Sequence, residues 1–317
     1  MLVGIANLAA QSRVLEAKRQ VRYLELPIRS LLNRAPDNMP FQWSINPYRG
    51  CEFGCKYCYA RYTHEYMGLE ESNEFEEQIY SKAGAAQALV RDLRKVRAGD
   101  HIAIGTATDP YQPAERRFGT TRSILQVFAS GTGRRLSLTS KSDLVTRDLA
   151  LLKRIARANV MHVNITITSV DPELARALEP RAPHPDLRLR AVERLARAGL
   201  SVGVFANPIM PRITDGEDNL DRLAAAAADA GAQYLGGGLL FMKPCTEKVF
   251  FPFLEARFPN LIERYRQHFA RDAYLRGPYV DGIRARLARI RERHGLAASP
   301  VDYEPELGQL SLFDGRV

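Results

Sequence analysis

The sequence predicts an α/β protein whose core is a partial (β/α)6 TIM-like barrel, with an N-terminal extension and a C-terminal helical region. The chain has 317 residues, 45% of them hydrophobic, which is enough for one large core. Along it, six short apolar runs rich in β-branched residues are separated by amphipathic segments. Successive β-then-α units are expected to build a parallel sheet through right-handed crossovers.

The individual elements can be placed in chain order. The expected strands are 42–46, 101–106, 136–140, 161–168, 201–206 and 233–240. Helical patterns between them cover 84–96, 142–158, 186–199 and 215–231. The last two patterns end in Gly199 and Gly231, and glycine is the residue expected just past a helix. In such a sheet the chemistry collects at the carboxyl ends of the strands.

The chain divides into four expected parts. These are an N-terminal extension over 1–40, a core barrel over 41–240, a helical basic region over 241–300 and a flexible tail over 301–317. No apolar run approaches the length of a membrane span, and the first residues lack the cleavage pattern of a signal peptide. We therefore expect a cytoplasmic protein that does not engage the membrane.

The charge of the chain favours a polyanionic partner. Lys and Arg number 45 against 36 Asp and Glu, which leaves a formal net charge of +9. Nucleic acid is the commonest partner of such a protein. A basic surface without any such partner is the alternative interpretation.

Three of the four cysteines lie on one loop directly after the first expected strand. They are Cys51, Cys55 and Cys58, and Gly50 and Gly54 allow the backbone there to wrap around a compact group. Thiolates suit zinc or iron and sulfur. Structural zinc sites use four protein ligands, usually as two separated pairs, whereas an iron-sulfur cube held by three cysteines keeps one iron open. We expect the cube, and zinc with His64 as fourth ligand is the alternative.

The spacing Cys-x3-Cys-x2-Cys, with Tyr57 directly before the last cysteine, resembles the signature of the radical S-adenosylmethionine (radical SAM) enzymes. Further segments resemble the spore photoproduct lyase branch of that family, over about residues 30–240. They are NPYRGCEFGCKYCYARY, GTATDPYQPAE, LTSKSDLVTRDLALL, ITITSVDPELARALEPRAPHPDLRLRAVERLARAG and PIMPRITD.

This resemblance implies a cofactor set and a reaction class. The cofactors would be a 4Fe-4S cluster and S-adenosylmethionine, with a flavodoxin- or ferredoxin-type electron donor. Reductive cleavage would give a 5'-deoxyadenosyl radical that abstracts hydrogen from a DNA lesion during repair or modification. Two alternatives stay open. One is modification of RNA or a peptide, and the other is a non-catalytic iron-sulfur accessory protein that binds DNA.

The same resemblance implies cofactor-binding roles for a set of polar residues. Tyr57 would approach the adenine of the cofactor. The other cofactor-binding candidates are Thr106, Thr108, Asp109, Ser140, Lys141, Thr166, Thr168 and Ser169. Of these, 106–109 would bind the methionyl end, Lys141 the carboxylate or ribose, and Ser169 the ribose hydroxyls. The alternatives are structural: a packed loop, a capped turn before Pro110, or a surface lysine.

Two residues are candidates for handling the radical. Tyr59 stands at the position of a radical-relay tyrosine of the lyase. The lyase also carries a cysteine that returns hydrogen to the product radical in the segment equivalent to GTATDPY, where this chain has none. Cys245, in FMKPCTEK, is the candidate substitute, and a buried structural thiol is the alternative.

The region before the tail predicts a basic amphipathic helix. Within 276–295, Val280, Ile283, Leu287 and Ile290 form one apolar stripe. The arginines around the rest of the helix are Arg284, Arg286, Arg289, Arg291 and Arg293. We expect these arginines to contact nucleic-acid phosphates, and a solvated helix face is the alternative.

The last residues resemble the peptide by which bacterial proteins bind the sliding clamp. Gln309, Leu310, Leu312 and Phe313 are the candidate contacts within Gln-Leu-Ser-Leu-Phe. Apolar anchors on a flexible tail can fill a pocket of a partner and tether the protein to it. A tail whose apolar residues cover its own domain is the alternative.

Overall fold

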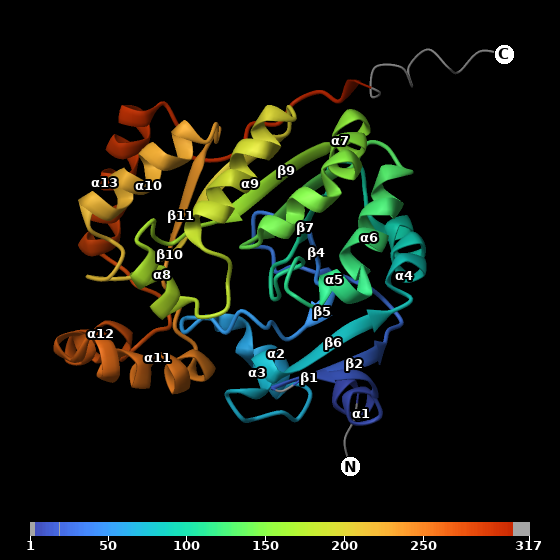
Figure 1. Cartoon of the computed structure of the whole chain (residues 1–317), viewed down its shortest axis with the longest axis horizontal. Helices are drawn as coiled ribbons and strands as arrows, with labels where there is room; N and C mark the ends of the chain where they lie inside the picture. The colour runs from blue at the N-terminus through green and yellow to red at the C-terminus, as the bar shows by residue number, and fades with distance from the viewer. Residues whose placement is uncertain (1–3, 19, 307–317) are drawn as a thin grey trace.

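The computed structural model describes residues 4–18 and 20–306 (Figure 1). Its larger sheet has seven strands in the order β11-β10-β9-β8-β7-β4-β3. Their bounds are β3 Leu32–Arg34, β4 Trp43–Ile45, β7 His101–Ile104, β8 Arg135–Ser140, β9 Val160–Thr166, β10 Ser201–Ile209 and β11 Leu235–Leu239. In this sheet β4, β7, β8, β9, β10 and β11 are parallel and follow chain order, and β3 is antiparallel to β4 at the edge. The six predicted strands and their order are thus confirmed.

Two details differ from the sequence-based expectation. Strands β7 and β9 end at Ile104 and Thr166, so Thr106 and Thr168 lie in the loops that follow them. Within the described residues β11 pairs only with β10, and β3 only with β4, so the sheet is open and does not close into a barrel.

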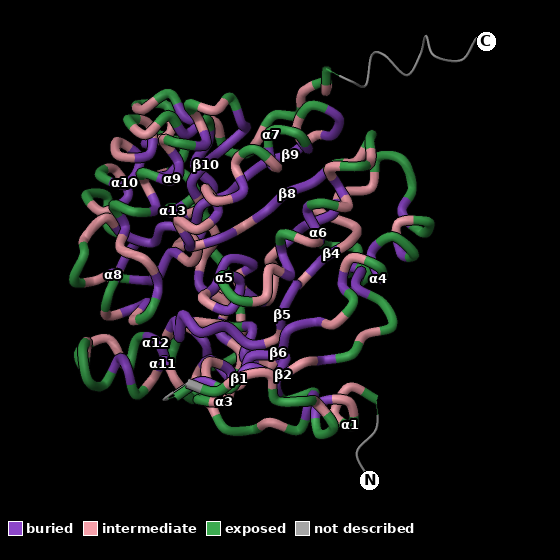
Figure 2. The backbone as a smooth tube through the Cα atoms, turned by 45° about the vertical axis from the view of Figure 1, so that its right-hand side comes forward, coloured by how far each residue is buried: buried purple, intermediate pink, exposed green. Residues whose placement is uncertain are grey.

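Helices lie along the outer side of this sheet (Figure 1). They are α4 Ala85–Asp92, α6 Thr120–Ala129, α7 Leu149–Ala158, α9 Pro185–Arg197 and α10 Glu217–Asp229. Two short helices, α5 Glu115–Phe118 and α8 Pro172–Leu178, lie in the connections apart from this row. The four predicted helical segments are therefore helical, with shorter bounds. Segment 142–158 begins as a 3-10 helix over Asp143–Asp148, whose first turn the Ser142 hydroxyl caps. Figure 2 shows the strands as the most buried part of the chain, and Ile102, Leu138 and Val163 are fully buried there.

A second sheet lies beside the first and was not predicted. It contains β1 Arg13–Lys18, β2 Val21–Pro27, β5 Tyr48–Arg49 and β6 Gln78–Ala83, in the order β1-β2-β6-β5. Short helices accompany it: α1 Ile5–Ala10, α2 Tyr62–Glu65, α3 Glu74–Glu77, and a 3-10 turn at Tyr59–Arg61. A second 3-10 turn, Leu93–Lys95, continues α4 on the larger sheet. Strand β6 pairs in parallel with β2, so part of the N-terminal extension is joined to the segment that follows the cysteines.

The C-terminal region is helical, with α11 Pro244–Arg257, α12 Ile262–Phe269 and α13 Pro278–His294, and a 3-10 turn at Pro259–Leu261. The predicted apolar stripe of α13 is buried, with Leu287 lying over Gly237 of β11. A Cβ at Gly237 would come within 2.8 Å of Leu287, so glycine permits this close approach. Among the described residues, no helix combines the length and apolar character that crossing a membrane requires.

Candidate active site

The cysteine loop is held in one conformation by its contact with the chain before β6. Gly50 has a φ of +77°, and a Cβ there would lie 2.6 Å from the Gln78 oxygen and 2.8 Å from that of Phe75. Only glycine fits this position without a shift of the backbone. The next residue, Cys51, donates its backbone N–H to the Phe75 oxygen at 2.9 Å. The first cysteine is therefore fixed against the second sheet.

All three cysteines are free thiols in one buried cluster. Cys51 and Cys55 belong to it together with Tyr57, and Cys58 packs against it. Burial raises the pKa of each thiol, that of Cys55 to about 12. Three thiolates in such a place require a bound cation to stabilise them, as iron or zinc does.

The surroundings of the loop fit an iron-sulfur cube better than zinc. In the described part of the chain, no three Cys, His, Asp or Glu side chains are grouped to hold one metal ion. The alternative fourth ligand, His64, has its Nε2 engaged with the Gln78 backbone oxygen at 3.0 Å, and its buried Nδ1, which has no partner among the described residues, belongs to no such group. A tetrahedral zinc ion needs ligands that converge on one point, whereas the thiolates of a cube bind separate irons.

A buried network connects the loop to the end of β9. The Tyr57 hydroxyl donates to Glu179, which forms an ion pair with Arg188 at 2.5 Å. Arg188 also donates to the backbone oxygen of Thr166 at 3.1 Å. Burial would raise the pKa of Glu179, but Arg188 and then Lys141 hold it below its ordinary value. The adenine candidate Tyr57 is thus oriented by Glu179 and Arg188, two residues that the sequence interpretation did not single out.

Lys141 is positioned by Asp109. The Asp109 carboxylate accepts the Lys141 backbone N–H and the Ser140 hydroxyl, both at 2.7 Å, and the Tyr111 N–H at 2.9 Å. Burial alone would lower the pKa of Lys141, but Cys55 and Glu179 raise it overall, so its ammonium stays charged. The Lys141 ammonium lies 5.7 Å from the centre of the Tyr57 ring. Asp109 therefore orders the strand end, and Lys141 supplies the positive charge beside the cysteines.

The remaining polar candidates form hydrogen bonds within the loops around the cysteines. Thr108 donates to the Gly50 oxygen at 2.6 Å. Thr106 bonds to Asn46 at 3.1 Å, and Ser169 donates to Asn219 at 2.6 Å. Thr168 is 3.4 Å from Glu179. These hydroxyls hold neighbouring loops together, and whether they also bind a cofactor stays a prediction.

Cys245 contacts the backbone of Tyr59 at the end of the cysteine loop. The Tyr59 hydroxyl donates to the backbone oxygen of Thr106 at 2.5 Å, and the Tyr59 side chain is 38% exposed. Cys245, at the start of α11, has its sulfur 3.6 Å from the Tyr59 backbone oxygen. Burial raises the pKa of the Cys245 thiol, so it keeps its hydrogen at neutral pH. The structure thus brings together the two residues proposed to handle the radical.

From Tyr59 a continuous series of rings, here called the aromatic file, extends across the surface. In order of contact it comprises Tyr66, Tyr62, Tyr59, Phe241 and Tyr274, with successive ring centres 5.6, 6.4, 5.9 and 4.3 Å apart. Tyr66 and Tyr274, at its two ends, are 63% and 53% exposed. The Lys243 ammonium lies over the Tyr62 ring, 3.7 Å from its centre. Sequence reasoning missed this file because its members come from three separate segments.

The five arginines of α13 divide into two groups. Three of them hold the helix to the rest of the protein, each through a hydrogen bond of 2.6 Å. Arg286 donates to the backbone oxygen of Asp215, Arg291 donates to the backbone oxygen of Leu235, and Arg293 donates to the Asp221 carboxylate. Arg284 lies 3.6 Å from Asp281 of its own helix, and Arg289 is exposed. Phosphate contact stays a prediction, best carried by Arg284 and Arg289. The clamp-binding candidates Gln309, Leu310, Leu312 and Phe313 lie outside the described residues.

Comparison with known sequences places most of the chain in one family. The family model described as the radical SAM superfamily matches residues 45–224. An uncharacterised protein of Mycobacterium tuberculosis is 34% identical over 289 residues, 90% of this chain and 85% of that protein. Another, of Methanocaldococcus jannaschii, is 27% identical over 237 residues, 74% of this chain and 78% of that one.

Comparison with solved structures gives the same architecture. A mutant spore photoproduct lyase with bound AdoMet and dinucleoside spore photoproduct superposes with a TM-score of 0.67 at 16% identity, covering 90% of this chain and 86% of the lyase. A second lyase complex with dinucleoside spore photoproduct gives a TM-score of 0.64 at 17% identity, covering 86% and 79%. At these identities the likeness shows a shared fold.

Proposed function

This chain belongs to the radical SAM superfamily, and on that basis we propose that it is a lyase-type enzyme that repairs or modifies a DNA lesion. Its open sheet would serve as the partial (β/α)6 barrel of such an enzyme. A pyrimidine lesion of the kind produced by ultraviolet light is the proposed substrate class.

The cofactors of this family are a 4Fe-4S cluster and S-adenosylmethionine, and when bound they supply a 5'-deoxyadenosyl radical. The residues of this chain fit them. Cys51, Cys55 and Cys58 offer three soft ligands, the first two buried and the third half-buried, and a cluster held by three thiolates has one iron free for the cofactor. The charged ammonium of Lys141 suits the methionyl carboxylate, and Tyr57 suits the adenine.

The observation that carries the nucleic-acid assignment is the aromatic file at Tyr59. Five touching rings with exposed ends resemble the stacking platforms of proteins that bind unpaired bases, where each stacked base contributes about 1–3 kcal/mol. Lys243 adds a cation to the same surface. Arg49 is a second, half-buried cation close to Tyr62; its side chain donates to the Thr63 backbone oxygen, and its buried Nε has no hydrogen-bond partner among the described residues. Bases turned out of a duplex could stack here beside the cysteine loop.

The hydrogen atom that completes the reaction would come from the Cys245 thiol, either directly or by way of Tyr59. The thiol keeps its hydrogen because of its burial, and it lies against the residue that follows Cys58. Donation of a hydrogen atom would leave a thiyl radical and a closed-shell product. One further electron from the flavodoxin- or ferredoxin-type donor and one proton, passed directly or through the Tyr59 hydroxyl, would convert the thiyl radical back to the thiol.

Anaerobic incubation with lesion-containing oligonucleotides, followed by mass analysis of the products, tests the proposal. We expect 5'-deoxyadenosine together with a repaired or altered pyrimidine pair, and both should require the reduced cluster. Formation of 5'-deoxyadenosine with conversion of RNA or a peptide, but never of DNA, would redirect the assignment to those substrates. Absence of 5'-deoxyadenosine under reduction would identify a non-catalytic iron-sulfur accessory protein.

Two partners belong to this proposal. A flavodoxin- or ferredoxin-type protein would deliver the single electron that cofactor cleavage consumes. The sliding clamp would hold the enzyme at replicating DNA through Gln309, Leu310, Leu312 and Phe313.

A further inference from the structure

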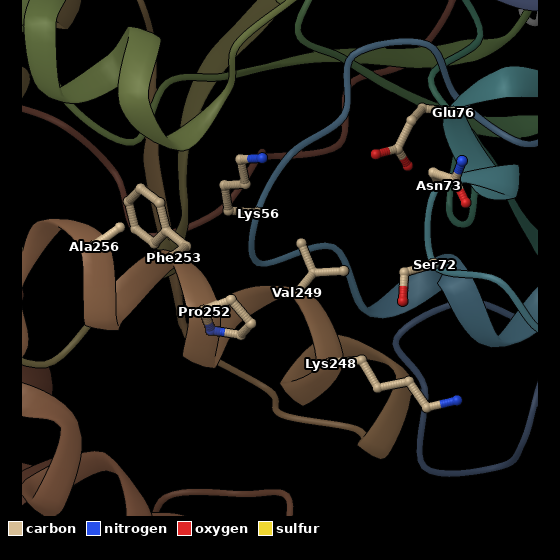
Figure 3. Close-up of a pocket in the computed structure, with 9 residues that line it drawn as sticks. All are labelled: Lys56, Ser72, Asn73, Glu76, Lys248, Val249, Pro252, Phe253 and Ala256. Carbon is tan, nitrogen blue, oxygen red and sulfur yellow. The ribbon is translucent and has the colours of Figure 1, made fainter.

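An open pocket of about 460 Å³ lies directly against the cysteine loop (Figure 3). Lys56, which stands between Cys55 and Cys58, forms one part of its wall. The opposite wall is the face of α11 that carries Lys248, Val249, Pro252, Phe253 and Ala256, and the segment before β6 adds Ser72, Asn73 and Glu76. Neither the cofactor residues nor the aromatic file uses this pocket.

Short contacts connect the residues that line the pocket to the cysteine loop. The Lys56 backbone N–H bonds the Leu178 oxygen at 2.9 Å, which fixes the loop against the end of α8. Behind Glu76, the buried Arg61 donates to the Cys55 backbone oxygen at 3.2 Å and pairs with Glu76 at 2.5 Å. The pocket is therefore a place where a bound protein would come close to a cluster held by these cysteines.

Cations border the pocket on its Lys56 and α11 sides, whereas the segment before β6 is acidic, with Glu71 and Glu74 beside Ser72 and Asn73. Lys56 and Lys248 border it, and a second open pocket of about 540 Å³, beyond the last turn of α11, is bordered by Arg176 and Arg257. Arg176 bonds the backbone oxygens of Pro180 and Ala182, so no carboxylate neutralises it in those contacts. Of the carboxylates that line the two pockets, Glu76 is paired with Arg61, which leaves Glu173 alone against four cations.

We infer that these two pockets form one docking face for an acidic one-electron carrier protein. This inference rests on the proposed function. The face consists of Lys56, Lys248, Val249, Pro252, Phe253, Arg176 and Arg257. A basic rim around a small apolar centre fits the small, polar interfaces of electron-transfer complexes. The carrier loses one electron and the cluster gains it, and no bond is made or broken in this step. DNA is the competing polyanion, but a phosphate backbone would leave the apolar centre formed by Val249, Pro252 and Phe253 unused.

Binding of the carrier can be measured without turnover, by calorimetric titration of oxidised flavodoxin into the cluster-loaded chain. We expect the double variant Lys248→Glu with Arg257→Glu to weaken binding about tenfold or more, because both changes reverse a charge on the rim. Raising the salt concentration should weaken wild-type binding as well. Lys153→Glu, on the exposed side of α7, is the matched control and should bind as wild type does.

Two results would overturn the docking face. One is an equal dissociation constant for the double variant and wild type, and the other is an equal loss in the Lys153→Glu control. The inference is also wrong if a DNA duplex displaces flavodoxin and loses its own binding in the same double variant, since the face would then belong to DNA. A Lys56→Glu variant gives a second test of carrier binding. Its iron content is measured first, because Lys56 lies between two of the cysteines.

Chemical reduction separates failure of this inference from failure of the proposed function. Dithionite reduces a cluster without needing a protein docking face, so the double variant should cleave S-adenosylmethionine at the wild-type rate with dithionite and more slowly with reduced flavodoxin. If dithionite drives no cleavage even in wild type, the proposed function fails. If cleavage with dithionite is normal and flavodoxin acts equally on both proteins, only the docking face fails.

Discussion

The sulfur of Cys245 lies 3.6 Å from the backbone oxygen of Tyr59, although 186 residues separate them in the chain. The next residue repeats the connection, since Thr246 donates to the Cys58 oxygen at 3.4 Å. The start of α11 is therefore fastened to the end of the cysteine loop. The C-terminal helical region contributes directly to the site, beyond the stretch matched by the family model.

This relationship predicts the behaviour of Cys245→Ala. Cofactor cleavage should continue at close to the wild-type rate, because radical generation precedes hydrogen return. The product should change, as an unquenched substrate radical gives abnormal adducts. Mass analysis of the oligonucleotide products checks this, with Tyr59→Phe as the companion variant. Unchanged product and turnover would remove Cys245 from the mechanism.

Replacing Cys51, Cys55 or Cys58 with Ala should abolish both cluster assembly and reductive cleavage. Oxygen-free reconstitution of wild type should give about four iron and four sulfide per chain. Each variant should fall well below that content, whereas Cys245→Ala should retain it. Iron and sulfide analysis with absorption spectroscopy provides the measurement. Stoichiometric zinc in wild type, with no activity dependent on iron, would contradict the assignment.

Glu179→Gln should destabilise the protein strongly. Glu179 and Arg188 are 0% and 1% exposed, and loss of one partner leaves a buried charge uncompensated, which costs about 3–5 kcal/mol. Glu193→Gln is the matched control, because its ion pair with Arg197 is exposed and should contribute about 0.5 kcal/mol or less. Urea unfolding of both variants gives the two free energies. Equal small losses would show that the buried pair is not needed for stability.

His64 should make the stability of the cluster-free chain depend on pH. Burial lowers the pKa of His64 to about 4, below the value of about 6.5 expected in the unfolded chain. The unfolded state therefore takes up the proton first. This contribution is complete above about pH 6.5 and is lost as the pH falls towards 4. Between about pH 7 and about pH 5 the free energy of unfolding should drop by about 2 kcal/mol from this group.

A His64→Gln variant isolates that effect. Glutamine can still donate to the Gln78 oxygen, but it cannot take up a proton in this range. Urea unfolding at the two pH values should show a smaller drop in the variant than in wild type. Identical pH dependence in both proteins would rule out His64 as the source.

Truncating the apolar anchors of the tail should abolish binding to the sliding clamp. Each such anchor is worth about 2 kcal/mol or more, roughly thirtyfold in affinity, so Leu312→Ala with Phe313→Ala should remove the interaction. Arg316→Ala, in the same tail but outside the motif, is the control. Calorimetric titration of purified clamp measures all three proteins. If wild type shows no binding, or the double variant loses its cluster, the tail belongs to its own domain.

The sequence was informative wherever a signal was local. Alternating β and α segments predicted the six parallel strands in their correct order, and the spacing of Cys51, Cys55 and Cys58 predicted that these cysteines lie together, as they do. Both signals lie within short windows of the chain.

The missed features depend on residues that are distant in sequence. Strand β6 is buried at four of its six positions, so it lacks the alternation that marks a half-buried strand. Glu179 and Arg188 look like ordinary surface charges until folding sets them against Tyr57. The aromatic file likewise combines rings from around residue 60, from Phe241 and from Tyr274.

The close packing of Gly50 on Phe75 and Gln78 limits how the protein can be divided. The cysteine loop packs against the segment that leads into β6, and β6 pairs in parallel with β2. Strand β2 lies before the matched stretch 45–224. A fragment cut at the borders of that stretch would lose β2 and leave one edge of β6 bare. Exchange of the first 40 residues between relatives would have to preserve the β2–β6 register, from Arg22 opposite Gln78 to Pro27 opposite Ala83. The smallest piece that could be exchanged intact is therefore larger than the segment that bears the signature cysteines.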